Sequence, residues 1–294
     1  MTGMTPDSDQ PPIYLTTREA ADLLRVKERK VYDLAAADEI PHRRITGKLL
    51  FPRTELFAWI EQSGNAGATR AEVVGGSHDP LLAWAVGECG CGLATHFDGS
   101  RTGLDAFAAG RACIVGMHIT EGDGWNTGTV QEVVPRDAVL IGFARRSRGL
   151  ITAPGLGNPV HGLGELRGRR VVRRQDGAGA TTLLHHLLDR NGIDADTLTF
   201  TDTTARTESE AAAMLSEGAA DVALGLETVA RSYRLNFSGL VWERYDLLMD
   251  RRAYFTPPVQ ALVDFTRTDT FKQKAAAMGG YDLSVSGQVM WLSP

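Results

Sequence analysis

The sequence lacks several features that would define a class of protein at once. Its 294 residues contain only three cysteines, Cys89, Cys91 and Cys113, with neither a second Cys pair nor a His cluster to complete a zinc site. No run reaches the roughly 18 apolar residues of a membrane span, and the N-terminus has no apolar signal core. We therefore expect a soluble, cytoplasmic protein with buried thiols.

Motifs of catalysis are also missing. There is no Gly-x-Ser-x-Gly elbow, no His-Glu-x-x-His pair and no phosphate loop, and Gly177-Ala-Gly179 lacks the rest of a dinucleotide fingerprint. His185 and His186 are adjacent in an apolar helical pattern without a third ligand at metal-site spacing. The sequence thus predicts that the protein is not an enzyme and holds no metal or cofactor.

What the chain does contain is enough apolar material for two or three domains. It is 43% hydrophobic and 23% charged, with a formal net charge of -5. An acidic balance of this kind excludes a wholly basic nucleic-acid coat. Any contact with nucleic acid must come from a local basic patch.

Such a patch lies near the N-terminus. After a disordered tail predicted over residues 1–12, Thr16 and Glu19 have capping-box spacing at the start of one short helix, and a second helical pattern runs from Val26 to Leu34. A predicted β-hairpin follows, with its turn at Thr46-Gly-Lys48. Two short helices this close predict a helix-turn-helix, whose second helix enters a major groove.

The cations of this region fit phosphate contacts. They lie on the second helix and on the hairpin, and the candidate DNA-binding residues are Arg25, Lys27, Arg29, Lys30, Arg43, Arg44 and Lys48. The alternative is a solvated charged face on a helical unit that binds another protein.

Over about fifty residues this region resembles the excisionase-type winged helix-turn-helix, which is related to the MerR class. The motifs that carry the resemblance are Tyr14-Leu-Thr-Thr-Arg-Glu-Ala-Ala-Asp-Leu-Leu24, Val31-Tyr32, Gly47-Lys-Leu-Leu-Phe-Pro-Arg53, Leu56 and Trp59-Ile60. The resemblance implies a DNA-binding domain over residues 13–62 that binds double-stranded DNA. The helix from Lys27 would contact bases, and the Lys48 hairpin would be the wing.

A Gly- and Ala-rich stretch over residues 63–77 is predicted to be a linker, although its residues 71–74 could form a strand. From residue 78 to 294, apolar runs alternate with helical patterns, which predicts an α/β fold of two lobes. One strand, turn and helix there, Leu93 to Phe107, places Asp98-Gly-Ser100 in the turn. A helix N-terminus at a strand end is a typical site for an anion.

This second part resembles the type 2 periplasmic-binding-protein-like domain of cytoplasmic regulators associated with molybdate and tungstate. The motifs that carry the resemblance are His78-Asp-Pro-Leu-Leu82, Gly99-Ser100, Gly103-Leu104, Gly116-Met-His118, Trp125-Asn126, Gln175 with Gly177 and Gly179, Ala211-Ala-Ala213, Gly218, Ala220-Asp-Val-Ala-Leu-Gly225, Glu243-Arg-Tyr-Asp-Leu247 and Gly279-Gly-Tyr281. It implies two lobes that close over a small ligand, with crossover strands near Phe143 and Tyr245. Neutral hydroxyls and backbone N–H groups would hold an oxyanion there.

One segment departs from the family pattern. Where oxyanion-associated members carry a Gly-Ser-Gly-Thr-Arg-like turn, this chain has Gly177-Ala-Gly-Ala-Thr181 with Asp176 beside it, and Ser209 lies near the place of a usual His. A carboxylate facing a dianion would repel it. The alternative effector is therefore a small organic metabolite, either a cation held by Asp98 or Asp176 against Trp125 or a carboxylate clamped by Arg101, Arg174 or Arg206.

The candidate effector-binding residues are Asp98, Gly99, Ser100, Trp125, Asn126, Gln175, Asp176, Gly177, Thr181, Ser209 and Tyr245. Together with the basic helix they predict a one-component transcriptional regulator, expected to be a homodimer because helix-turn-helix proteins commonly bind paired half-sites. Its predicted effector is molybdate or tungstate. The rival class is a ligand-binding scaffold whose N-terminal part contacts protein.

Overall fold

The computed structural model describes residues 12–64, 70–122, 124–134, 136–156 and 160–294. The chain divides into two compact units, Met1–Thr69 and Arg70–Pro294, and each is described by itself. The predicted disordered tail over residues 1–12 lies almost wholly outside the described residues.

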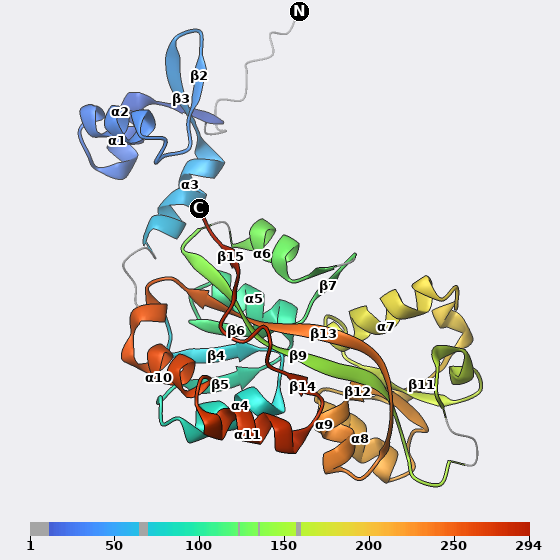
Figure 1. Cartoon of the computed structure of the whole chain (residues 1–294). Coiled ribbons are helices and arrows are strands. Elements are labelled where there is room, and N and C mark those ends of the chain that lie inside the picture. Colours follow the sequence, from blue (N-terminus) through green and yellow to red (C-terminus); the bar gives the residue numbers. More distant parts are fainter. Residues whose placement is uncertain (1–11, 65–69, 123, 135, 157–159) are drawn as a thin grey trace, which may run out of the picture. The chain divides into compact units, whose positions relative to one another are not determined.

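The N-terminal unit is a winged helix-turn-helix, as the sequence predicts (Figure 1). Its elements are β1 (Tyr14–Thr16), α1 (Thr17–Leu24), α2 (Glu28–Ala36), β2 (Arg43–Ile45), β3 (Lys48–Pro52) and α3 (Arg53–Gly64). The strands form an antiparallel sheet in the order β1-β3-β2, so the β2-β3 hairpin is the wing.

Local chemistry explains where these elements begin and turn. At the start of α1, Thr16 accepts a hydrogen bond from the Glu19 N–H, and Glu19 accepts one from the Thr16 N–H, which completes the predicted capping box. The wing turns at Thr46 and Gly47, whose φ angles of 48° and 80° are those of a two-residue hairpin turn.

A small apolar core holds this unit together. Leu15, Val31, Ile40, Phe51 and Leu56 are buried and pack against one another across the helices and the sheet. Among the large apolar residues of this unit, Val26 and Phe57 lie outside the core. Val26 is 39% exposed because it lies in the turn between α1 and α2, and Phe57 is 37% exposed on α3. Phe57 is instead covered by the guanidinium of Arg53, 5.1 Å from its ring centre.

The C-terminal unit is a mixed α/β fold built on a 10-stranded sheet (Figure 1). The main path runs β11-β10-β12-β9-β13-β6-β4-β5, and β14 and β15 pair with β9. Its strands are β4 (Val73–Gly76), β5 (Ala94–Phe97), β6 (Ile114–Met117), β9 (Ala138–Thr152), β10 (Arg170–Arg174), β11 (Thr199–Ala205), β12 (Val222–Leu226), β13 (Asn236–Asp250), β14 (Tyr281–Asp282) and β15 (Val289–Leu292), and a separate pair is β7 (Thr120–Glu121) with β8 (Gly124–Trp125).

Helices cover this sheet. They are α4 (Pro80–Glu88), α5 (Ser100–Ala108), α6 (Thr127–Val133), α7 (Gly179–Arg190), α8 (Glu208–Ser216), α9 (Glu227–Ser232), α10 (Pro257–Phe265) and α11 (Asp269–Met278), with short 3₁₀ helices η1 (Leu163–Leu166), η2 (Ala195–Thr197) and η3 (Ala253–Phe255). Among the described residues, no helix combines the length and apolar character that crossing a bilayer requires.

Two long strands define the lobes. β9 and β13 pair antiparallel along nearly their whole lengths and run through the unit, as expected for crossover strands around Phe143 and Tyr245. At one end they adjoin the parallel strands β4, β5 and β6, and at the other end the parallel strands β10, β11 and β12. Each lobe therefore has its own set of parallel strands. The two crossover strands, β9 and β13, run through both lobes and join these sets into one sheet.

The predicted linker is too long at its C-terminal end. Its residues Val73–Gly76 form β4, an inner strand of the first lobe that pairs in parallel with both β5 and β6. Gly75 and Gly76 give this segment the composition of a linker. They lie in the sheet because neighbouring backbone approaches them closely, most closely at Gly76, where a Cβ would meet the Gly116 backbone.

Candidate functional site

A small cleft lies where the two lobes meet. Its lining comes from both lobes and consists of Ser77, His78, Phe97, Gly99, His118, Arg174, Gln175, Ala178, Gly179, Ala180, Arg206, Thr207 and Glu208. These residues lie at or just after the C-terminal ends of the parallel strands, where open α/β sheets bind ligands. The cavity volume is about 30 Å³, room for a few water-sized atoms.

Two helices begin beside this cleft. The N-cap of α5 is Gly99 and that of α7 is Ala178, and neither supplies a side-chain hydrogen bond to the first turn. At α8, by contrast, Thr207 caps the Glu210 N–H. The open first turns of α5 and α7 leave N–H groups and the positive ends of two helix dipoles beside the cleft.

The lobes approach each other closely at these same helices. A Cβ on Gly179, at the start of α7, would lie 2.6 Å from Cε1 of His118 in the first lobe. A Cβ on Gly99 would lie 3.5 Å from Nε2 of Gln175 in the second lobe. The second distance is an ordinary van der Waals contact, so it is the absence of a side chain at Gly179 that permits this approach of the lobes.

Cations outnumber anions in the cleft lining. Arg174 and Arg206 belong to it, and Glu208 is its one carboxylate among the described residues. Glu208 is paired on both sides, with Arg174 at 2.9 Å and with Arg148 at 3.1 Å. Burial opposes ionisation of Glu208, but the charges of Arg148 and Arg174 outweigh it and lower its pKa to about 2. The carboxylate charge is therefore compensated before any ligand binds.

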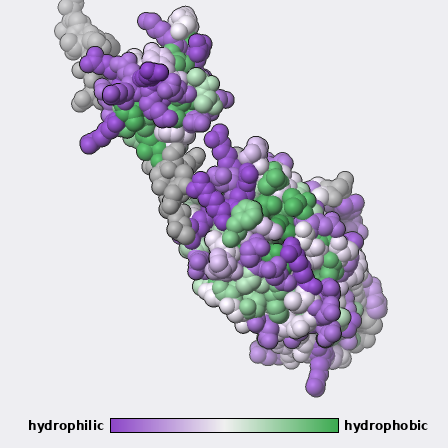
Figure 2. Space-filling model, turned by 60° about the vertical axis from the view of Figure 1, so that its left-hand side comes forward, coloured by the Kyte–Doolittle hydropathy of each residue, from purple (hydrophilic) through white to green (hydrophobic). Residues whose placement is uncertain are grey.

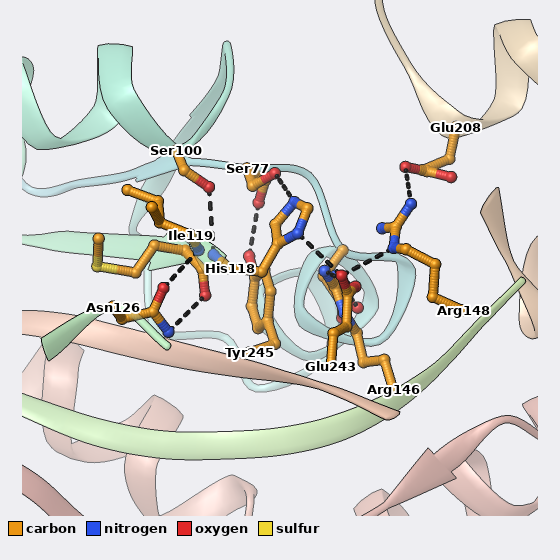
Figure 3. Close-up of polar contacts among 12 residues, drawn as sticks. Ser77, Ser100, His118, Ile119, Asn126, Arg146, Arg148, Glu208, Glu243 and Tyr245 are labelled. Carbon is orange, nitrogen blue, oxygen red and sulfur yellow. Dashed lines mark hydrogen bonds and ion pairs between the residues drawn. The ribbon is translucent and has the colours of Figure 1, made fainter. Parts of the chain in front are cut away.

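A buried hydrogen-bond chain leads away from the cleft (Figure 3). Nε2 of His118 lies 2.8 Å from Oγ of Ser77, and Nδ1 of His118 lies 3.0 Å from Oε2 of Glu243 on β13. All three residues are buried. We call Ser77, His118 and Glu243 the Ser–His–Glu chain.

Glu243 is also the centre of an ion-pair network on the crossover strands (Figure 3). Arg146 and Arg148 of β9 contact it at 2.5 Å and 2.8 Å, and Arg146 continues to Asp79 at 3.0 Å. Burial acts to raise the pKa of Glu243, but Arg146, Arg148 and His118 hold it well below its ordinary value. A continuous run of buried charge therefore joins the first lobe, both crossover strands and, through Arg148 and Glu208, the second lobe.

His118 is held in its neutral form. Complete burial lowers its pKa, and the charges of Arg146 and Arg148 act in the same direction, against the opposing pull of Glu243. His78, which lines the cleft, has its pKa lowered mainly by burial, and its ring packs edge-on to Phe97 at 5.3 Å. The cleft thus contains two histidines that favour neutrality.

Among the predicted effector residues, the structure places Gly99 and Gln175 in the cleft lining. Ser100 lies behind it, fully buried, where its Oγ accepts a hydrogen bond from the His118 N–H at 3.2 Å. Asp98 and Asp176 are exposed and lie outside the lining. Neither Asp98 nor Asp176, the carboxylates that suggested a cationic ligand, therefore faces the cleft.

The other predicted effector residues have internal roles. Asn126 is buried, accepts from the Ile119 N–H and donates to Asp246, and the Tyr245 hydroxyl donates to the Ser77 carbonyl at 2.5 Å. Thr181 donates to the Gln175 carbonyl, and Trp125 packs against the apolar core of the second lobe. Gly177, with a φ of 79°, forms the turn before α7, and Ser209 lies half-buried on α8; neither lines the cleft.

Several lining residues were missed as candidates, including Ser77, His78, His118, Thr207 and Glu208. Ser77 follows β4, and the segment from Val73 to Pro80 has the same strand, turn and helix pattern as Leu93 to Phe107. That similarity was a usable signal. The glycines of β4 concealed it because they resemble a linker.

The predicted DNA-binding cations form an exposed basic surface on the N-terminal unit. All seven are exposed: Arg25, Lys27, Arg29, Lys30, Arg43, Arg44 and Lys48. Most of the face of this unit seen in Figure 2 is hydrophilic. Arg43 is also paired with Glu55 at 2.8 Å, so its charge is partly neutralised. The basic residues lie on α2, beside it and on the wing, and their contact with DNA stays a prediction.

These observations define a helix-turn-helix joined to a two-lobed ligand-binding domain. A model of the periplasmic-binding-protein (PBP) superfamily domain matches residues 86–267, more than half of the chain, and a helix-turn-helix domain model matches residues 14–64. The chain belongs to the PBP superfamily. Its N-terminal unit is of a DNA-binding type, and the larger unit is of a type that binds small ligands.

Two bacterial relatives match parts of the chain. The uncharacterized protein YvgK of Bacillus subtilis (strain 168) is 24% identical over 200 residues, which cover 66% of this chain and 64% of that protein. An uncharacterized protein from the 5′ region of a ferredoxin 2Fe-2S gene of Clostridium pasteurianum is 31% identical over 80 residues, covering 27% of this chain and 71% of its own. The chain thus spans somewhat less than two thirds of the length of the first relative.

Solved structures share the fold. A phosphate-bound, putative phosphate ABC transporter substrate-binding protein from Clostridium perfringens has a TM-score of 0.55 at 13% identity, covering 70% of this chain and 96% of its own. The hydrogen peroxide-bound form of a Corynebacterium glutamicum OxyR mutant has a TM-score of 0.51 at 14% identity, covering 90% and 89%. At these identities the likeness concerns the fold alone.

Proposed function

We propose that this protein is a transcriptional regulator that binds duplex DNA through its N-terminal unit and a small oxyanion in the cleft of its PBP-like unit. The observation that carries the ligand class is the convergence of two uncapped helix N-termini, those of α5 and α7, on a cleft lined by Arg174 and Arg206. Backbone donors, helix dipoles and guanidinium groups all favour negative charge.

Other features support an anion over an organic cation. Asp98 and Asp176 are exposed and outside the cleft lining, and Trp125 packs in the second lobe's core, so none of these three side chains is placed to bind a cation there. Glu208, which does line the cleft, is already paired with Arg148 and Arg174. Molybdate and tungstate are the candidates that the sequence resemblance implies, and phosphate and sulfate have the same tetrahedral shape. The small cavity suits ions of this size.

A carboxylate-bearing metabolite is the second candidate effector. Arg174 and Arg206 lie on the second-lobe side of the cleft, where a guanidinium can bind a carboxylate through two hydrogen bonds. Arg174 already pairs with Glu208 at 2.9 Å, which leaves Arg206 as the more accessible of the two. A metabolite would need the lobes to open further than an oxyanion would.

We assign the cleft to binding rather than to catalysis. The Ser–His–Glu chain has the order of a catalytic triad, in which the acid stabilises a transient imidazolium. Here Glu243 already neutralises Arg146 and Arg148, and burial lowers the pKa of His118. Both effects disfavour the imidazolium that nucleophilic catalysis needs, and the same bonds hold Ser77 in a fixed orientation.

In the proposed mechanism, ligand binding changes DNA affinity by shifting the populations of the open and closed forms of the two lobes. An oxyanion that binds the closed lobes more tightly than open ones shifts the protein toward closure, by no more than the difference in its affinity for the two states. We propose that the regulator acts in the cytoplasm as a homodimer, in which closure changes how two recognition helices meet paired half-sites.

The ligand class is tested by thermal unfolding against molybdate, tungstate, sulfate, phosphate, glutamate and arginine. A ligand that binds only the folded state at about 100 times its Kd adds about 2.7 kcal/mol to the free energy of unfolding, so Tm rises. We expect a rise with at least one oxyanion, reduced in Arg206→Ala and unchanged in Arg267→Ala, which removes an exposed cation outside the cleft lining. A rise with arginine alone would refute the proposed ligand class.

A further inference from the structure

The direction of the hydrogen bonds along the Ser–His–Glu chain follows from its inner end. Glu243 is ionised, because it contacts Arg146 at 2.5 Å and Arg148 at 2.8 Å in a fully buried site. A carboxylate only accepts hydrogen bonds, so Nδ1 of His118, 3.0 Å away, must carry a proton and donate.

The outer end of the chain is then determined. His118 is buried between this carboxylate and two guanidinium groups and is neutral, so a proton on Nδ1 leaves Nε2 without one. Oγ of Ser77 lies 2.8 Å from Nε2. The Ser77 hydroxyl must therefore donate its only proton inward, to His118.

The Ser77 hydroxyl oxygen can consequently act only as a hydrogen-bond acceptor toward the cleft. A serine hydroxyl has one donor and two acceptor lone pairs, and its donor is already committed to His118. Ser77 lines the cleft and is itself 9% exposed, so little water can reach the hydroxyl. A ligand atom that approaches this oxygen must bring its own hydrogen.

Glu208 strengthens this requirement from the opposite lobe. It lines the cleft and stays ionised beside Arg148 and Arg174, so its oxygens too can only accept hydrogen bonds. Its Oε1 is held by the two arginines, and its buried Oε2 lies beside Gly225 of β12. Glu208 thus adds a compensated negative charge to the cleft lining, and Ser77 supplies the acceptor that the hydrogen-bond chain orients.

We propose that the effector is a small oxyanion that carries a hydrogen-bond donor, and that Ser77 Oγ accepts that hydrogen. The helix N-termini of α5 and α7 bind the anionic oxygens, and Ser77 selects for the protonated one. The inference rests on the oxyanion site proposed above and narrows its ligand. It favours ions such as monohydrogen phosphate over sulfate, molybdate and tungstate.

The selection has a simple electrostatic cause. At about pH 8, monohydrogen phosphate, sulfate and molybdate are all tetrahedral and carry two negative charges, but among them only phosphate has an O–H group. An ion without an O–H group would place one of its oxygens against the Ser77 oxygen, and two acceptors cannot form a hydrogen bond. Because little water reaches this site, the Ser77 oxygen would stay unpaired, which costs binding free energy. Sites built around such a hydrogen bond discriminate strongly against ligands that lack it.

The test is isothermal titration calorimetry of the full chain at about pH 8 in a chloride buffer, with phosphate, sulfate and molybdate as separate titrants. We expect phosphate to bind at least about tenfold more tightly than either other ion, a difference of about 1.4 kcal/mol. In Ser77→Ala the preference should fall toward unity, because a water molecule that fills the gap can either donate or accept. Ser238→Ala, a half-buried serine on β13 outside the cleft lining, should keep the wild-type preference.

The outcomes separate this inference from the proposed function. Sulfate or molybdate binding as tightly as phosphate to the wild-type protein would overturn the inference and leave the oxyanion site standing. A phosphate preference that persists in a Ser77→Ala variant shown to fold by its unfolding transition would remove Ser77 from the selection. Failure of all three ions to bind would overturn the oxyanion site itself.

Discussion

At the scale of single residues, the buried charges of the PBP-like unit depend on Glu243. Its carboxylate contacts His118, Arg146 and Arg148, and all four side chains are 3% exposed or less. Buried ion pairs add little net stability over apolar residues, but removal of one member leaves charge without compensation. Glu243 thus fixes both the arginines on β9 and the orientation of the Ser–His–Glu chain.

The stability cost of losing this carboxylate follows directly. We predict that Glu243→Ala lowers the free energy of unfolding by about 3–5 kcal/mol, because two buried guanidinium groups lose their shared partner. Urea unfolding measures the change. Glu217→Ala, which removes an exposed acid after α8, is the matched control and should change stability by less than about 0.5 kcal/mol. Equal effects of the two variants would contradict this view of the network.

His118 predicts a dependence of stability on pH. Burial lowers its pKa in the folded protein from 6.5, so below about that pH the unfolded chain binds a proton that the folded protein does not. Stability is then complete above the unfolded pKa and falls with decreasing pH, by up to about 1.4 kcal/mol per pH unit for this one group.

The measurement is urea unfolding of the wild-type protein and of His118→Gln at pH 7.5 and 5.5. We expect the wild-type protein to lose more stability over this range than the variant. The comparison cancels contributions from groups that both proteins share, such as Asp246, whose pKa is raised by burial and which acts in the opposite direction. A steeper loss in the variant would be the contrary result.

Local features of the fold and some of the site residues could be predicted from the sequence. Thr16 and Glu19 form a local motif three residues apart, and Gly99 and Gln175 follow recognisable strand ends. His118 and Glu243, by contrast, are 125 residues apart and meet only through the pairing of β6 with β13. Sequence patterns indicate local periodicity, so they do not predict which buried charged residues, far apart in the sequence, form pairs.

At the scale of elements, the N-terminus of α7 sets how closely the lobes approach. A Cβ at Gly179 would lie 2.6 Å from His118, a distance that real Cβ atoms essentially never show, so the buried His118 side chain or one of the lobes would have to shift. The helix that we propose to bind the anion through its first N–H groups therefore depends on a glycine for its position.

We predict that Gly179→Ala keeps the protein folded but removes most of the Tm increase caused by the stabilising oxyanion. The physical reason is that the donors of α7 can no longer reach the closed position. Thermal unfolding with and without the ion measures this. Gly164→Ala in η1, where a Cβ would meet open space, is the control and should retain the full increase. A full increase in Gly179→Ala would show that closure against His118 is not needed for binding.

Element prediction succeeded where apolar runs and caps are local. The strand β5 and the helix α5 occur within the predicted strand, turn and helix from Leu93 to Phe107, because an apolar run and helical spacing determine them. β4 was assigned to the linker because Gly75 and Gly76 have no side chains to form an alternating pattern, and they lie in the sheet for reasons of close packing. This close packing involves neighbouring strands, so the sequence of β4 alone does not indicate it.

At the scale of the whole molecule, the chain joins two functions that the family comparisons support separately. The helix-turn-helix model covers residues 14–64 and the PBP superfamily model covers residues 86–267. A ligand can change DNA binding only through a difference in its affinity for the two states of the protein, and typical couplings are about 1–3 kcal/mol. Ligand control of DNA binding therefore requires that the DNA-binding and non-binding states differ in their affinity for the ligand.

The most direct measurement is selection of bound duplexes from a random-sequence DNA pool by the full chain, with and without monohydrogen phosphate at matched ionic strength. We predict that one sequence is enriched and that phosphate changes the fraction of it that is retained, by about fivefold or more. Arg29→Ala with Lys30→Ala should abolish enrichment, because we propose that these exposed cations on α2 contact the DNA. The control pair Arg267→Ala with Lys272→Ala, exposed cations of the other unit, should preserve it. If no sequence is enriched, the protein is not a sequence-specific DNA-binding regulator. Enrichment that persists without Arg29 and Lys30 and that phosphate does not change would contradict ligand-controlled DNA binding through α2.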